Sequence, residues 1–168
     1  PSMQDDQWRF EGASGSPRLW TRVYNGPTQP TAAYNYIQPG PLIRVRPGDT
    51  LTVNVINNLG ANAAVSAACP NTLNTLHNPN TTNVHTHGLH ISSVEPADSV
   101  WTQILPGTTF QHVYKIAADH AGGTHWYHAH HHGSTAIQAG GGAAGLLIVD
   151  DETCGVPTRG STMPERPL

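Results

Sequence analysis

Apolar and polar residues alternate in short runs along most of this chain. Residues 50–55 read Thr-Leu-Thr-Val-Asn-Val, and residues 110–116 place Phe, His, Tyr and Ile at every second position. A period of two is that of a β-strand with one buried face. Shorter runs lie at residues 19–23 and 42–46, and the second stops at the turn sequence Pro47-Gly48-Asp49. The pattern predicts several brief strands.

Three segments depart from this alternation. Residues 144–149 are apolar throughout, which predicts a strand buried on both faces. Residues 134–139 precede Gly140-Gly141-Gly142 and predict at most one short helical turn, because a glycine triplet does not sustain a helix. Residues 71–83 are rich in Asn, Thr and Pro without periodicity and predict a surface loop. The chain is therefore expected to be all-β.

Length and composition favour one core. With 168 residues and 37% hydrophobic content, we expect a single domain over residues 1–152, followed by a Pro- and Gly-rich connection over residues 153–168 that leads toward a missing domain. The net charge of -3 forms no basic block, so nucleic acid is not an expected partner. No apolar run reaches the roughly 20 residues of a membrane-spanning helix.

The two cysteines carry a prediction about compartment. Cys69 and Cys154 both lie in segments flanked by Pro or Gly and outside the strand pattern. We expect them to form a disulfide, with buried free thiols as the alternative, and a disulfide predicts a periplasmic or extracellular location.

Histidine is the compositional outlier, because seven of the 11 histidines lie between His112 and His132. Two motifs contain histidines separated by one residue, with His85 and His87 in the first and His128 and His130 in the second. In a strand such partners share a face about 6.6 Å apart, so two pairs on facing strands would bring four imidazoles together. Neutral imidazole binds copper most tightly among common divalent ions, although three or four histidines also suit zinc.

Other residues near these pairs are candidates for supporting roles. Alternation places Trp126 on the same face as His128, and it also places His132 there if the strand continues past His130. His132 is then an outer partner of the metal ligands, or else a solvent-exposed side chain. Asp98, in a Glu-Pro-Ala-Asp turn between the pairs, is a candidate proton relay, or it stabilises the turn.

Taken together, these motifs resemble the N-terminal cupredoxin domain of a multicopper oxidase, the family that includes laccases and bacterial copper-efflux oxidases. The resemblance rests on residues 39–50, on Asn-Val-His-Thr-His-Gly at residues 83–88 and on Gly-Thr-His-Trp-Tyr-His-Ala-His at residues 123–130. It spans about residues 25–150 and implies a Greek-key β-sandwich of the cupredoxin type.

The resemblance also implies a function. In that family a trinuclear copper cluster reduces dioxygen to water with electrons from small reducing substrates such as phenols or cuprous ion. By position, His85 resembles the type 2 copper ligand, while His87, His128 and His130 resemble type 3 ligands. Asp98 resembles the acidic residue near the cluster. The remaining ligands are expected from another cupredoxin domain or another subunit.

Departures from the family pattern leave alternatives open. The type 1 copper site needs a His-Cys-His segment, and this sequence contains none. We therefore expect the chain to supply four ligands and to lack turnover by itself. The alternative is a stand-alone exported protein that binds and buffers copper. A zinc hydrolase ranks last, since no Glu that could act as a general base lies near either histidine pair.

Overall fold

Eight strands and one short helix make up the described part of the protein. The computed structural model describes residues 2–9, 18–26, 40–63 and 75–150. The first sheet has the order β2-β1-β4-β6 and the second has the order β3-β8-β7-β5. The strands of the first sheet are β1 (Ser2–Arg9), β2 (Arg18–Asn25), β4 (Thr50–Asn57) and β6 (Thr109–Lys115). Those of the second are β3 (Gly40–Val45), β5 (His85–His87), β7 (Gly123–His128) and β8 (Ala144–Val149).

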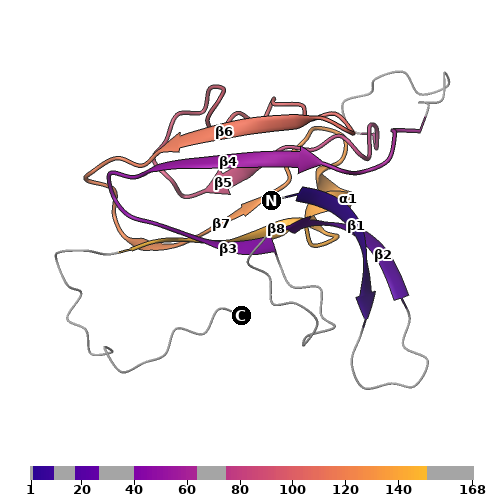
Figure 1. The fold of residues 1–168 in the computed structure, drawn as a ribbon, viewed down its shortest axis with the longest axis horizontal. Helices are drawn as coiled ribbons and strands as arrows, with labels where there is room; N and C mark the ends of the chain where they lie inside the picture. The colour runs from indigo at the N-terminus through magenta and orange to yellow at the C-terminus, as the bar shows by residue number, and fades with distance from the viewer. Residues whose placement is uncertain (1, 10–17, 27–39, 64–74, 151–168) are drawn as a thin grey trace.

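The two sheets form a sandwich. In Figure 1, β4 and β6 make the upper layer, and β3, β7 and β8 make the lower one. From β3 to β7 each successive strand lies in the opposite sheet, so the chain crosses between the two layers at every step. This architecture confirms the all-β expectation, and α1 (Thr135–Ala139) confirms the single helical turn.

The predicted alternation corresponds to burial. Along β4, Val53 and Val55 are buried and the intervening Asn54 is exposed. Across the sandwich, Tyr127 on β7 and Leu147 on β8 are also buried. These side chains belong to one core cluster that fills the space between the sheets. Along β8 no residue is exposed, but only every second residue is fully buried, so one face of the strand is completely covered and the other is covered in part.

A close contact between β7 and β8 depends on glycine. Gly145 pairs with Tyr127, and a Cβ atom built on Gly145 would lie 2.4 Å from the Tyr127 ring. The missing side chain therefore leaves room for the aromatic ring. The Tyr127 hydroxyl then donates to the Pro41 carbonyl at 2.7 Å, which ties β7 to the start of β3.

Two features differ from the sequence expectations. The polar segment 71–83 was predicted to be a surface loop, yet Thr81, Thr82 and Asn83 are buried. Polar side chains are stable there because protein partners replace water; for example, the Thr81 hydroxyl accepts a hydrogen bond from Asn62. Strand β1 was not anticipated, because residues 2–9 show no apolar alternation. Backbone pairing with β2 along its whole length organises β1.

Candidate metal centre

The register between β5 and β7 brings the two histidine motifs together. The strands are antiparallel, and His85 lies directly opposite His128 while His87 lies opposite Trp126. Side chains of directly opposite residues are neighbours on one face of a sheet. The imidazole rings of His85 and His128 are accordingly 5.6 Å apart, and those of His87 and His128 are 5.0 Å apart, measured between ring centroids.

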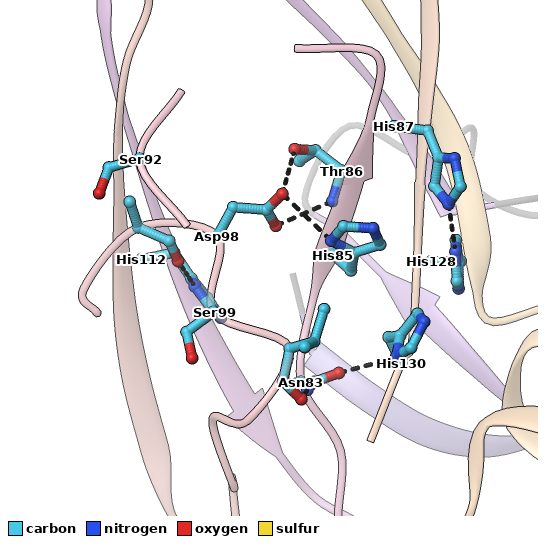
Figure 2. Close-up of polar contacts among 12 residues, drawn as sticks. Asn83, His85, Thr86, His87, Ser92, Asp98, Ser99, His112, His128 and His130 are labelled. Carbon is cyan, nitrogen blue, oxygen red and sulfur yellow. Dashed lines mark hydrogen bonds and ion pairs between the residues drawn. The ribbon is translucent and has the colours of Figure 1, made fainter. Parts of the chain in front are cut away.

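His130 completes the group from outside the strand. β7 ends at His128, so the prediction that both members of this pair lie on one strand is wrong. The ring of His130 nevertheless lies 5.1 Å from that of His85 and 5.5 Å from that of His128. Figure 2 shows the four imidazoles gathered around one small volume.

The nitrogen atoms have distances that suit metal coordination. His85, His87 and His128 each offer a ring nitrogen, and these nitrogens lie within 4.8 Å of one another. The Nε2 atoms of His87 and His128 are 3.0 Å apart. Two ligands at about 2.0 Å from a copper or zinc ion with this separation subtend an angle of about 97° at the metal. The pair therefore fits adjacent positions in one coordination sphere.

Asp98 lies behind the ligand group and contacts β5. Its Oδ1 accepts a hydrogen bond from Thr86 N at 3.0 Å, and its Oδ2 accepts one from the Thr86 hydroxyl at 3.0 Å. The Nδ1 atom of His85 faces the same Oδ2 at 3.1 Å, at an angle that does not meet the criteria for a hydrogen bond. The carboxylate favours the tautomer of His85 that carries its hydrogen on Nδ1. In this tautomer Nε2 is free to bind a metal.

Local electrostatics favour neutral imidazoles. Desolvation and the nearby rings of His85 and His130 lower the pKa of His87, although Asp98 acts in the opposite direction. Desolvation is also the main cause of the lowered pKa of His128, together with the neighbouring histidines. A metal binds the neutral ring, so these shifts extend the pH range over which the ligands are available. The donor set, several neutral imidazoles, fits copper.

Trp126 and His132, the other two candidate supporting residues, differ in their placement. Trp126 stacks on both His87 and His128, with ring centroids 4.6 and 4.5 Å apart, which confirms that it shares the ligand face. His132 is exposed, and its ring lies 5.3 Å from that of His77. Because β7 ends at His128, strand alternation does not carry His132 to the ligand face, and its outer-partner role stays a prediction.

Sequence reasoning missed Asn83, which precedes the first histidine pair. Its side chain is fully buried and accepts a hydrogen bond from the backbone N–H of His130 at 2.8 Å. The sequence includes it only as the first residue of the first histidine motif and assigns it no role, because it also ends a polar segment that predicts a loop. His112, which the sequence left out of the ligand set, lies in the core, where its Nδ1 is 2.9 Å from the Ala97 carbonyl.

Some expectations fall beyond the part of the chain that the structure describes. Cys69 and Cys154 lie outside the described residues, so their pairing stays a prediction, as does the connection at residues 153–168. Among the described residues, none of the helices has the length and apolar character needed to cross a membrane.

Comparisons with known proteins agree on one family. The sequence model described as multicopper oxidase matches residues 19–69 and 68–153. Laccase-2 of Fomitopsis schrenkii is 33% identical over 110 residues, covering 63% of this chain and 18% of that protein. The iron transport multicopper oxidase FET3 of Gibberella zeae is 32% identical over 117 residues, covering 66% of this chain and 15% of that protein.

Solved structures give the same result. A bacterial laccase-like multicopper oxidase, CueO from Ochrobactrum sp., superimposes with a TM-score of 0.60 and 26% identity, covering 89% of this chain and 26% of that one. The chain thus spans less than a fifth of the curated relatives named above and about a quarter of this structure. The family match extends over more than half of the chain, on a β-sandwich of the cupredoxin type with clustered histidines, and the protein therefore belongs to the multicopper oxidase family.

Proposed function

We propose that this chain supplies four histidine ligands to the copper centre of a multicopper oxidase. His85 would bind the type 2 copper, and His87, His128 and His130 would bind the type 3 pair. The observation that carries the proposal is the convergence of ring nitrogens from β5 and β7 to within 4.8 Å of one another. Copper bound there supplies reversible one-electron chemistry and a site for dioxygen.

In the proposed reaction, a small reducing substrate such as a phenol or cuprous ion gives up electrons one at a time, and dioxygen is reduced to water. The chain's own residues hold the metal and manage protons. His85 presents Nε2 while its Nδ1 faces Asp98. Asp98, which is buried and accepts a hydrogen bond from Thr86, would hold or pass a proton next to the centre.

The centre needs a partner. Four imidazoles cannot complete the coordination of three copper ions, so the other ligands must come from another cupredoxin domain or another subunit. The sequence has no His-Cys-His segment for a type 1 copper, and electrons would therefore also enter through the partner. The proposed location is periplasmic or extracellular. A mass shift on reduction and alkylation that reports a Cys69–Cys154 disulfide supports this location, and two free thiols would speak against it.

Oxygen uptake tests the proposal. The full-length protein, loaded with copper, is assayed with a phenol and with cuprous ion beside its His87→Ala and His128→Ala variants. Both variants should lose most turnover and bound copper. His90→Ala is the matched control, because His90 is exposed and contacts His120 rather than the four ligands. Unchanged oxygen uptake in the His87 and His128 variants would refute the proposal.

The 168-residue chain is assayed separately. It should bind copper, as shown by electron paramagnetic resonance, without sustained oxygen uptake. Sustained turnover of this chain alone would contradict the need for a partner. Reversible copper binding without oxygen uptake by the native, full-length protein would instead favour a copper-buffering function.

A further inference from the structure

Asn83 makes three hydrogen bonds that connect separate parts of the metal centre. Its Nδ2 donates to the carbonyls of Val100 and Thr102 at 2.9 and 3.1 Å. Its Oδ1 accepts from the backbone N–H of His130 at 2.8 Å. The residue is 0% exposed, so no water replaces these partners if they are removed. The side-chain amide of Asn83 therefore joins the backbone of His130 to the loop that carries Asp98.

The first connection holds His130. This histidine lies beyond the end of β7, so the sheet ladder does not fix its backbone. The bond from Asn83 comes from the segment that leads into β5 and thus sets the position of His130 relative to His85. Figure 2 shows this bond below the histidine group.

The second connection holds the loop between β5 and β6. Val100 and Thr102 follow Asp98 closely along the chain, and their carbonyls are the ones that Asn83 binds. Asn83 is itself anchored, because the Tyr24 hydroxyl donates to its carbonyl and the adjacent Thr82 bridges to Ile104. The amide is therefore a fixed point from which both His130 and the Asp98 loop are placed.

We infer that Asn83 is a positioning residue of the copper centre, which aligns His130 and Asp98 on either side of His85. The inference rests on the proposed function, since it concerns the same ligands. Outer residues that orient metal ligands typically change metal affinity by about 10- to 100-fold when they are removed. Asn83 acts through a backbone N–H and two carbonyls, so its effect should appear in the geometry of the bound metal.

The chain contains a matched control for this residue. Asn57 is also 0% exposed, and its Nδ2 donates to the carbonyls of Asn80 and Ile104, both at 2.8 Å. Its Oδ1 accepts from the backbone N–H of Leu59 at 3.1 Å. The two asparagines thus make the same number and kind of bonds at the same burial. Of the two, only Asn83 binds the backbone of a proposed copper ligand, that of His130.

The experiment compares Asn83→Ser with Asn57→Ser in the full-length protein. Both substitutions should lower the Tm of the metal-free protein by a similar amount, roughly 5 °C or more, because each leaves buried backbone groups without a hydrogen-bond partner. Only Asn83→Ser should weaken Cu(II) binding by about 10- to 100-fold in a chelator competition and change the copper hyperfine spectrum. Asn83→Asp, which keeps a side-chain oxygen at the position that accepts from the His130 N–H, should recover part of the affinity.

Each outcome decides between the hypotheses. Wild-type protein that binds no copper refutes the proposed function itself. Wild-type binding with equal affinities and spectra for the Asn83 and Asn57 variants overturns the positioning role alone. If Asn83→Ser does not fold, Asn83→Asp is compared with Asn57→Asp instead. In the metal-free wild type, the His130 amide should exchange as slowly as strand amides, and rapid exchange there also overturns the inference.

Discussion

The replacement of Asp98 by Asn tests how the protein prepares His85 for copper. In the wild type, the carboxylate accepts hydrogen bonds from the backbone N–H and the hydroxyl of Thr86. Its Oδ2 also lies 3.1 Å from Nδ1 of His85. An amide of the same shape keeps one oxygen and replaces the other with an NH₂ group, which is a donor. If the oxygen stays on Thr86 N, the NH₂ group faces His85 Nδ1. The tautomer with hydrogen on Nδ1 then meets a second donor.

His85 can respond by moving its hydrogen to Nε2. The bare Nδ1 then accepts a hydrogen bond from the amide NH₂ group. This tautomer places a hydrogen on the atom that should bind copper. A hydrogen bond to a charged group contributes about 1.5–3 kcal/mol, which corresponds to a loss of affinity of about 10- to 150-fold. The range measured for outer residues of metal sites, about 10- to 100-fold, overlaps it.

Two measurements check this expectation. Competition between the protein and a chelator gives the Cu(II) affinity of wild type and Asp98→Asn, and nitrogen-15 NMR of the metal-free protein gives the tautomer of His85. Asp49→Asn is the control, because the Asp49 carboxylate accepts from Arg46 N at 2.8 Å in an exposed turn away from the histidine motifs. It should leave both copper affinity and the His85 tautomer unchanged.

The reasoning is refuted if Asp98→Asn binds copper within about twofold of wild type while His85 keeps its hydrogen on Nδ1. That result would mean that the metal-free ring does not depend on the carboxylate for its tautomer. The role of Asp98 would then be limited to fixing Thr86 on β5.

Three other predictions follow from the packing. Burial lowers the pKa of His112 below its usual 6.5, and its Nε2 has no hydrogen-bond partner. The unfolded state therefore binds more protons than the folded state below pH 6.5, and the free energy of unfolding falls as the pH decreases. His112→Phe should make the free energy of unfolding depend less on pH in this range, and an unchanged dependence contradicts the assignment. Gly145→Ala should cost about 1–3 kcal/mol in denaturant unfolding, because its Cβ meets the Tyr127 ring; a neutral effect would show that the ring can move. Cu(II) should quench Trp126 fluorescence through the stacked His87, and quenching of equal depth in Trp126→Phe would show that the signal comes from another tryptophan.

The strand pattern and the candidate metal ligands could be proposed from sequence, for local reasons. Alternation at residues 50–55 and 110–116 reflects one buried face, and β4 and β6 lie at these positions. The His-x-His spacing puts two imidazoles on one face of an extended segment wherever that segment lies. Both signals depend on residues that are close together along the chain, so they can be recognised without knowledge of the fold.

Tertiary structure decided how these pieces meet. The register that sets His85 opposite His128, the position of His130 beyond the end of β7 and the burial of Asn83 all depend on contacts between residues far apart in sequence. A polar segment buries an amide only when distant backbone groups satisfy its hydrogen bonds, and those partners leave no trace in local composition. The chain's own sequence therefore determined which side chains are candidate metal ligands, and the folded sandwich determined where those side chains are held.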